Sequence, residues 1–372
     1  MKQFFTVFFS IIGALFFAQN VLFEDVNLKN AIIVAYPNVD VDKDGEISEE
    51  EAKTLTVIRN LRPVQKITSA KGIEAFTELT ELNLGTNSIK EIDVSKNINL
   101  RTLNLRQNNL EGHLDVSNLS QLTNLELNEN ALESIALPES GTLVFLYLNK
   151  NKFADLDVTA QKNLRRFFAV GNQLEAIDIS QNTALERLHI EDNKLTVLDL
   201  SGLEKLSWVS LVSNLVTDII LKDNLALRTI LANNNQLKIL NLQDGLDSAF
   251  GVINVTNNPD FEEIKKDCKD TITTIFPTGI TVTDNCDTLS TELATAQSTA
   301  KIGPNPFYDN VKLEGFKNVK TIEILDASGK ILKTMTAATA ENLNLKDLPN
   351  ATFYFLKIED ASGVRIFKLL KK

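Results

Sequence analysis

The sequence predicts a mainly β, α+β repeat fold, a solenoid in which short parallel strands stack into one long sheet. An asparagine recurs nine times at steps of 21 to 23 residues, each time within the frame L-x-x-L-x-L-x-x-N-x-L. The Leu-x-Leu pair has a period of two, which is typical of a strand that buries one face. One strand cannot bury that face alone, so successive copies must stack and share a core. The asparagines are Asn87, Asn108, Asn130, Asn151, Asn172, Asn193, Asn214, Asn235 and Asn258.

The frame stays in register across residues 74–261, and one copy consists of Leu185, Leu188, Ile190, Asn193 and Leu195. The array resembles the leucine-rich repeat family, which implies a parallel sheet on the concave face. Each asparagine is expected where the chain leaves the strand, where its amide satisfies backbone groups beyond the sheet ladder. Many repeats carry a second short segment of alternating apolar and polar residues after the asparagine, such as Leu198-Asp199-Leu200-Ser201. This segment is too short for a helix, so we expect extended or single-turn structure on the outer face.

Composition places the chain among ordinary globular proteins. It has 372 residues, of which 43% are hydrophobic and 23% charged, and its formal net charge is -11. This length allows more than one domain. The acidic balance and the lack of a basic stripe argue against a nucleic-acid partner.

Residues 1–18 have the pattern of a signal peptide, in which Lys2 precedes an apolar run and cleavage is expected after Ala18. Phe16 stands where a small residue is usual, which leaves the exact site open. The alternative, a retained membrane anchor, is disfavoured because the run is short and no later apolar stretch reaches ~20 residues. The first cysteine is Cys268, so none follows the signal to carry a lipid. We expect an exported mature chain without a transmembrane segment.

Residues 19–73 are expected to form an N-terminal cap. Leu28, Ala31 and Ile32 have helical spacing, and Pro37 ends that helix. The stretch 40–51 then matches D-x-D-x-D-G-x5-E at every position and resembles an EF-hand calcium loop.

The resemblance implies a set of oxygen ligands for calcium, with Gly45 at the sharp turn. Side chains would come from Asp40, Asp42 and Asp44, a backbone carbonyl from Glu46, a water-bridged contact from Ser48 and a bidentate carboxylate from Glu51. The alternative is an acidic surface turn. Only one such loop is present, so we expect a structural ion that holds the cap on the first repeat rather than a sensor.

Strand alternation also identifies the side chains that face outward from the sheet. Early repeats present small polar residues there, whereas middle repeats present aromatic rings and arginines on four adjacent strands, over about 15 Å. Such residue types are enriched at binding hot spots, although aromatic residues also simply suit a sheet surface. We expect this set to bind a ligand: Phe145, Tyr147, Arg166, Phe168, Arg187, His189 and Trp208. Phe167 and Ala169 occupy inward positions and are expected to pack in the core.

Residues 262–287 are expected to cap the last repeat. They contain both cysteines of the chain, Cys268 and Cys286. In an exported protein a disulfide between them is the default, and free thiols are the alternative. A zinc site is improbable because two thiols without nearby histidine are an incomplete ligand set. Residues 288–300 are rich in Thr, Ser and Ala and are expected to be a linker.

Residues 301–372 show short alternating strands separated by turns, which predicts an immunoglobulin-like antiparallel β-sandwich. This stretch resembles the type A C-terminal sorting domain of the type IX secretion system of Bacteroidetes. The matching elements are Gly303-Pro304-Asn305-Pro306, Gly329-Lys330, Phe353 to Ile358 and Phe367 to Lys371. Asn350-Ala351-Thr352 stands where the family usually has a glycine. The resemblance implies that the secretion machinery recognises residues 301–372 and that the protein is released or stays on the cell surface.

A catalytic role has little support in the sequence. Only two histidines occur, His113 and His189, and common hydrolase, metalloprotease and phosphate-binding motifs are missing. We therefore expect a protein for recognition or adhesion that binds a protein or a surface glycan. The alternative is an architectural component of the envelope or matrix without a specific ligand.

Overall fold

The computed structural model describes residues 19–243, 248–284, 301–303, 307–314, 316, 319–326, 330–336, 342–349, 352–360 and 363–371. The chain divides into two compact units, Met1–Asn285 and Cys286–Lys372, each of which is considered by itself. The expected signal peptide (1–18) and linker (288–300) lie outside the described residues. None of the helices in the described ranges combines the length and apolar character that a bilayer crossing requires.

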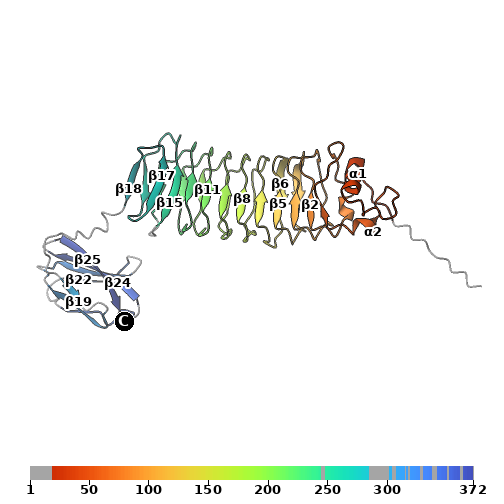
Figure 1. Ribbon diagram of the computed structural model, residues 1–372. Helices are drawn as coiled ribbons and strands as arrows, with labels where there is room; N and C mark the ends of the chain where they lie inside the picture. Colours follow the sequence, from red (N-terminus) through yellow and green to blue (C-terminus); the bar gives the residue numbers. More distant parts are fainter. Residues whose placement is uncertain are drawn as a thin grey trace, which may run out of the picture. The chain divides into compact units, whose positions relative to one another are not determined.

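A parallel sheet of 11 strands runs the length of the first unit (Figure 1). We call it the long sheet. Its strands, in spatial order, are β1 (Val57–Ile58), β2 (Glu81–Asn83), β3 (Thr102–Asn104), β5 (Asn124–Glu126), β7 (Phe145–Tyr147), β8 (Arg166–Phe168), β9 (Arg187–His189), β11 (Trp208–Ser210), β13 (Thr229–Leu231), β15 (Ala249–Asn254) and β17 (Thr271–Phe276). The register aligns inward residues such as Leu103, Leu125 and Leu146, all fully buried. The predicted repeat solenoid is confirmed.

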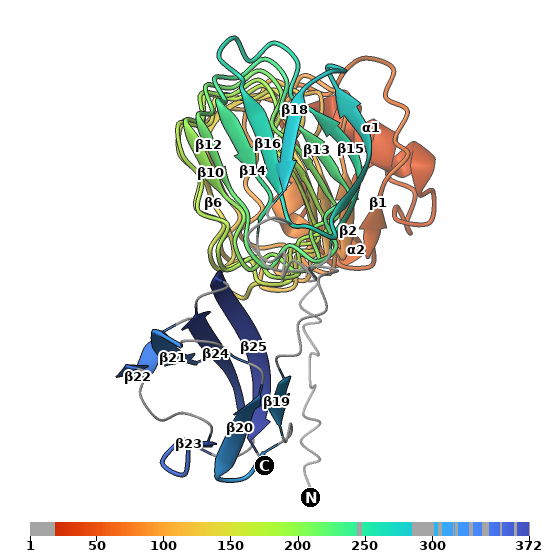
Figure 2. The same cartoon turned by 90° about the vertical axis from the view of Figure 1, so that its left-hand side faces the viewer.

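Short strands form the opposite side of several repeats, and other repeats have extended chain without a strand there, in agreement with the expectation of extended or single-turn structure. Two parallel pairs are β4 (Glu111–Asp115) with β6 (Ala131–Ala136) and β10 (Val197–Asp199) with β12 (Asp218–Ile220). A third parallel sheet has β16 (Glu263–Lys266) between β14 (Ile239–Asn241) and β18 (Thr281–Asp284). Figure 2, which looks along the array, shows these strands on the side opposite the long sheet. The leucine core lies between the two sides.

The recurring asparagines form a buried hydrogen-bond ladder. Asn172 accepts from the backbone N–H of Phe153 at 3.1 Å and donates to the carbonyls of Leu148 and Ala169 at 3.0 Å. Each amide therefore satisfies backbone groups in two repeats, as expected. The residue before it is left-handed, for example Thr86 at φ 66°.

A second buried amide column was not foreseen. Asn97, Gln161, Asn182 and Asn224 are almost inaccessible and donate to backbone carbonyls of the previous repeat. Asn182, for example, donates to the carbonyls of Val158 and Gln161 at 2.9 Å. The sequence feature that could have predicted this column is an amide side chain two residues after an Asp-x-Ser motif, as in Asp178-Ile-Ser180-Gln-Asn182.

The N-terminal cap extends the long sheet, because β1 pairs with β2. Helix α1 (Val26–Ala35) buries Leu28, Ala31 and Ile32, as its spacing predicts. Its N-cap residue Asp25 accepts from the backbone N–H of Asn27 at 2.8 Å and from that of Thr68 at 2.6 Å. Burial pushes the pKa of the Asp25 carboxyl upward, but these hydrogen bonds outweigh burial and lower it overall. The start of the helix is thereby tied to the part of the cap that leads into the first repeat.

The stretch expected as a C-terminal cap, 262–287, continues both sides of the solenoid instead of forming a separate element. β16 pairs with β14, β17 with β15 and β18 with β16. Ile264 is fully buried, which explains why the stretch can add further strands, whereas Thr281–Asp284 are all exposed and end the array with a polar edge. Cys268 is disulfide-bonded. Because Cys286 lies outside the described residues, its pairing with Cys268 stays a prediction.

The second unit contains two antiparallel sheets. One has β19 (Lys301–Gly303), β20 (Asn310–Glu314) and β23 (Asn342–Asn344), and the other has the order β22 (Ile331–Thr336), β21 (Thr321–Leu325), β24 (Thr352–Asp360) and β25 (Gly363–Lys371). Phe307, Val311, Ile322 and Leu356 share one buried core. The predicted sandwich is confirmed, including the last hairpin, in which Asp360 is opposite Gly363.

Candidate binding site

Seven outward side chains of the long sheet lie on four neighbouring strands, β7, β8, β9 and β11. We call them the central patch: Phe145, Tyr147, Arg166, Phe168, Arg187, His189 and Trp208. The strand register places them in two columns, as alternation predicts. One column runs Phe145, Arg166, Arg187, Trp208, and the other runs Tyr147, Phe168, His189. The structure therefore brings together every residue that was expected in this site.

The aromatic rings of the central patch form a continuous row, in which each ring contacts the next. Ring centroids are 6.4 Å apart for Phe145 and Tyr147, 5.0 Å for Tyr147 and Phe168, 4.4 Å for Phe168 and His189, and 6.3 Å for His189 and Trp208. All five rings are only partly exposed. Such ring contacts limit side-chain rotation, so the patch is preorganised before any ligand arrives.

The two arginines of the central patch are exposed and occupy adjacent strands. The Cζ atom of Arg166 lies 5.4 Å from the centroid of the Phe145 ring, within the range of a cation–π contact. Neither Arg166 nor Arg187 forms an ion pair with any residue that the structure describes. By contrast, Arg165 on the same repeat is paired with Glu186 at 2.6 Å. Two positive charges are therefore available in a chain whose net charge is -11.

Glu191 joins the patch, although sequence reasoning did not include it. Its Oε1 lies 3.0 Å from Nδ1 of His189. Burial raises the pKa of the Glu191 carboxyl, but hydrogen bonding, first of all with His189, outweighs burial and holds the pKa below its usual range. An ionised Glu191 can only accept, so Nδ1 of His189 carries the hydrogen. The sequence feature that could have predicted this role is the position of Glu191, two residues after His189 on the same side of the chain.

Trp208 ends the chain of rings on β11. Its indole N–H is buried, with no hydrogen-bond partner among the described residues. The residue as a whole is partly exposed, so its ring is shared between the surface and the neighbouring side chains. The strand register places Trp208 on the outward side, as expected. Its indole N–H, however, is covered by neighbouring atoms.

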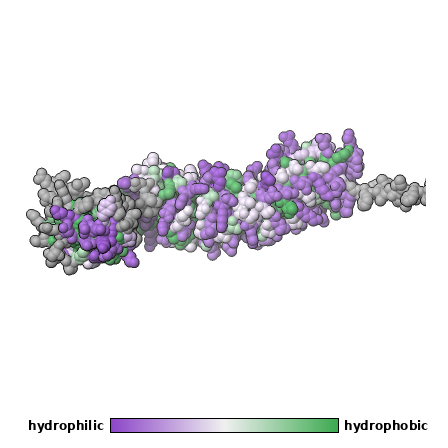
Figure 3. Space-filling model, turned by 90° about the horizontal axis from the view of Figure 1, so that it is seen from below, coloured by the Kyte–Doolittle hydropathy of each residue, from purple (hydrophilic) through white to green (hydrophobic). Residues whose placement is uncertain are grey.

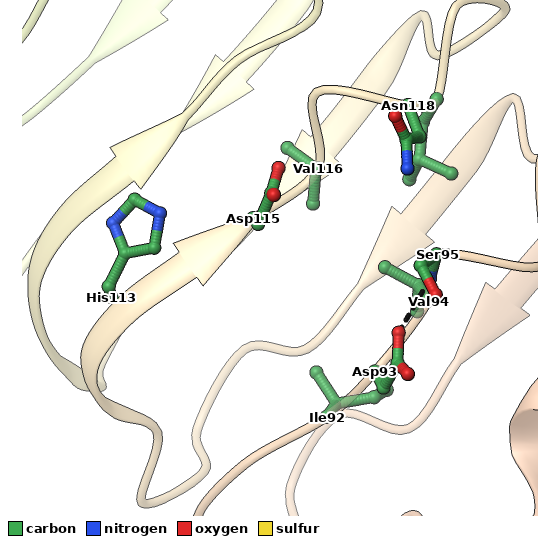
Figure 4. Close-up of a pocket in the computed structure, with 9 residues that line it drawn as sticks. Ile92, Asp93, Val94, Ser95, His113, Asp115, Val116 and Asn118 are labelled. Carbon is green, nitrogen blue, oxygen red and sulfur yellow. Dashed lines mark hydrogen bonds between the residues drawn. The ribbon is translucent and has the colours of Figure 1, made fainter.

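The outer side of the repeats also carries a depression. Figure 3 shows a side where hydrophilic residues dominate and hydrophobic ones are scattered in small groups. A depression of about 250 Å³ on the outer side is lined by Asp93, His113 and Asp115 among others (Figure 4). Asp93 and Asp115 accept from the backbone N–H two residues further on, and His113 contacts Ser134 at 2.8 Å. The two carboxylates are therefore engaged in local turns, and His113 is engaged with a residue of the next repeat.

The predicted calcium loop lies in the cap, away from the central patch in sequence. Carboxylate oxygens of Asp40, Asp42 and Asp44 lie within 4.8 Å of one another, and Gly45 has φ 80°. Carboxylates gathered this closely suit a hard cation, so this donor set fits calcium. Glu51 is oriented differently: its oxygens accept from the backbone N–H groups of Val41 at 2.7 Å and Ser48 at 2.8 Å.

The other two expected ligands, Glu46 and Ser48, take part in contacts that hold the loop to its surroundings. The carboxylate of Glu46 pairs with Lys29 of α1. The expected calcium ligand at this position is the backbone carbonyl of Glu46, which the ion pair does not involve. Ser48 forms a β-bridge with Asn20, and the backbone N–H of Val21 donates to Ile47 at 2.8 Å. The residues at the start of the described chain therefore brace the loop, where a paired EF-hand would supply a second loop.

Comparison with known proteins identifies the second unit. Residues 301–372 match the secretion system C-terminal sorting domain, which indicates type IX secretion and export to the cell surface or extracellular space. No curated protein matches the chain.

Several solved structures are similar to this chain. One is an internalin (inlF) from Listeria monocytogenes, with 24% identity, a TM-score of 0.37, and coverage of 70% of this chain and 91% of that chain. Internalin C2 from the same organism has 20% identity, a TM-score of 0.43, and coverage of 58% and 92%. The leucine-rich repeat domain of APL1B has 22% identity, a TM-score of 0.40, and coverage of 53% and 57%.

Proposed function

We propose that this chain is an exported recognition or adhesion protein that binds a protein or a surface glycan through the central patch. The observation that carries the proposal is the pair of exposed arginines, Arg166 and Arg187, which form no ion pair within the described part of the chain and lie among five contacting rings. Aromatic residues and arginine are enriched at the energetic centres of interfaces. The sorting domain at 301–372 supports display outside the cell, where such a surface would meet its ligand.

The scaffold beneath the patch favours binding because it is already ordered. Leu146, Phe167, Leu188 and Val209 lie under the patch and are fully buried. The asparagine ladder fixes the turns beside the same strands. A rigid surface loses little conformational entropy when it binds, so more of the contact energy contributes to affinity.

Trp208 gives a direct test because it is the only tryptophan of the chain. Its emission is recorded on the full chain while host proteins and surface glycans are added one at a time. A true ligand shifts the emission, and the double variant Phe145→Ala with Tyr147→Ala weakens that ligand's binding at least tenfold without changing the far-UV circular dichroism. The matched control, Thr102→Ala with Asn124→Ala, alters two outward residues of early strands and keeps full affinity.

An architectural component without a specific ligand is the alternative function. It would tolerate the Phe145 and Tyr147 substitutions in every assay of envelope or matrix assembly. No shift of Trp208 emission with any member of the panel, together with normal assembly by the variant, would establish this alternative.

For the cap we propose a structural calcium ion held by Asp40, Asp42, Asp44 and Glu51, with the carbonyl of Glu46 and, through water, Ser48. When bound, the cation neutralises carboxylates that otherwise repel one another. Coordination by Glu51 requires its carboxylate to exchange hydrogen bonds with Val41 and Ser48 for the ion. The proposed role is stability of the cap, which covers the first repeats.

A further inference from the structure

We infer that the central patch is shaped for an acidic amphipathic helix of a partner protein, laid along the array across the strands. The inference rests on the proposed function and specifies the partner. Its starting point is the column Phe145, Arg166, Arg187, Trp208, in which two unpaired arginines lie between two apolar rings. The complementary ligand presents an apolar group, two anions and a second apolar group in that order.

The spacing of the column matches a helix. Neighbouring strands of a sheet are about 4.8 Å apart, so Phe145 to Trp208 spans roughly 14 Å in three steps. Residues i, i+3, i+7 and i+10 of a helix share one face and rise about 4.5, 6.0 and 4.5 Å in turn, a total of about 15 Å. An extended peptide in the same direction places side chains of one face about 6.6 to 6.8 Å apart, which drifts out of register by the third strand.

The ring geometry disfavours a sugar chain. A saccharide that stacks along the array needs successive ring faces in a common plane. Here the planes of Tyr147 and Phe168 differ by 56°, and those of Phe168 and His189 by 60°. The two outer contacts are nearly parallel, at 6° for Phe145 and Tyr147 and 14° for His189 and Trp208. The two central contacts are inclined, so the middle of the patch is ridged, and this suits the side chains of a helix better than the flat faces of sugar rings.

Charge supports an acidic partner of this kind. Arg166 and Arg187 lie on adjacent strands and neither is neutralised by a described carboxylate, whereas Arg165 is already paired with Glu186. Two like charges at this separation repel each other, and carboxylates at i+3 and i+7 of a bound helix would relieve that repulsion. Ionised Glu191 lies at the edge of the patch, next to His189, and is expected to exclude acidic residues from that side.

The test uses the full chain and a synthetic Ala- and Gln-rich helical peptide with Leu at i and i+10 and Glu at i+3 and i+7. Binding is measured by titration calorimetry and by Trp208 emission. We expect a second peptide of equal composition, with both Glu residues moved to the opposite face, to bind at least tenfold more weakly. Arg166→Gln and Arg187→Gln should each weaken the first peptide about tenfold, the size of one charged contact at an interface.

Arg165→Gln is the matched control, since it removes one arginine of the same repeat whose charge is already compensated, and it should leave the affinity unchanged. Equal binding of the two helical peptides, no binding of either, or tighter binding of an alternating Leu/Glu extended peptide would overturn the inference. Tighter, Arg166-dependent binding of an oligogalacturonate would also overturn it while leaving the central patch as a glycan site. Failure of the proposed function is distinct: the Phe145 and Tyr147 variant would then keep every interaction of the protein.

Discussion

The early strands of the long sheet (β2, β3 and β5) and its middle strands (β7, β8, β9 and β11) share an inward side and differ on the outward side. Their inward residues are all fully buried and apolar. On the early strands, outward groups satisfy one another: Asn104 donates to Glu126 at 2.7 Å, and Glu81 pairs with Arg59 at 3.4 Å. On the middle strands, Arg166 and Arg187 have no such partner among the residues that the structure describes. The comparison teaches that the same buried architecture runs through both regions, whereas the outward side differs in whether its charged groups have described partners, and the proposed binding site lies where they have none.

The largest expected effect tests the shared inward architecture. Asn108→Ala on an early repeat and Asn172→Ala on a middle one each orphan up to three backbone groups. Each buried unsatisfied group costs about 1–3 kcal/mol, so both variants should lose about 3 kcal/mol or more of unfolding free energy. Urea denaturation measures the loss, and hydrogen exchange shows whether it is local.

Asn109→Ala is the control for this prediction, because the Asn109 side chain is exposed beside the ladder. It should change stability by less than about 0.5 kcal/mol. A loss below about 1 kcal/mol in either ladder variant, or a clear difference between early and middle repeats, would break the view that the inward side is uniform.

Calcium removal is expected to affect only the early end. If the ion is present at about 100 times its Kd, its loss costs about 2.7 kcal/mol, so EDTA should lower the Tm by roughly 5 °C. Hydrogen exchange should increase in β1 to β3, while Trp208 emission stays unchanged. The reason is that each repeat contacts only its neighbours, so the loosening fades along the array.

Asp44→Asn should abolish the effect of EDTA on the Tm. Glu49→Gln, which alters an exposed acid outside the expected ligand set, should preserve it. An identical melting curve with and without Ca²⁺ would refute the structural ion, and increased exchange throughout the middle strands would show that the two regions are not independent.

The smallest expected effect concerns the left-handed residue before each ladder asparagine. An early repeat has Thr86 at φ 66°, whereas a middle repeat has Gly171 at φ 68°. Gly171→Thr should cost about 1–2 kcal/mol, because a residue with a Cβ is strained in the left-handed conformation. A steric clash should add nothing, since a Cβ at this position would lie 3.6 Å from Lys150, an ordinary contact distance.

The reverse change, Thr86→Gly, should stabilise the protein by less than about 1 kcal/mol, because the relief of strain is offset by glycine's unfolded-state entropy. It also removes a hydrogen bond from Thr86 to Gln107 at 3.1 Å. Thermal melts compare the two variants directly. If Gly171→Thr did not change the Tm, the left-handed position before each ladder asparagine would impose no residue preference. The difference between Thr86 and Gly171 would then not affect stability.

Most of the candidate site could be predicted because strand alternation is local. Once Leu146 and Leu188 are placed inward, Tyr147 and His189 must face outward, since successive side chains of a strand point to opposite sides. The ladder asparagines were located by a different local signal, their recurrence at steps of 21 to 23 residues. Glu191 escaped prediction because it follows the strand, where alternation ends and the direction of a side chain depends on the turn.

The sequence by itself determined the repeat, its register, the two-unit organisation and the identity of the outward columns, because each depends on spacing along one chain. Only the tertiary structure decided which of these residues touch. The contact of Phe168 with His189, the pairing of Arg165 with Glu186, and the bracing of Ser48 by Asn20 join residues 21, 21 and 28 positions apart. Such contacts depend on side-chain rotamers and on stacking between repeats, so no local pattern specifies them. For that reason the sequence could predict a candidate binding site, whereas the arginines without a described ion-pair partner and the inclined central rings are the basis of the proposed kind of ligand.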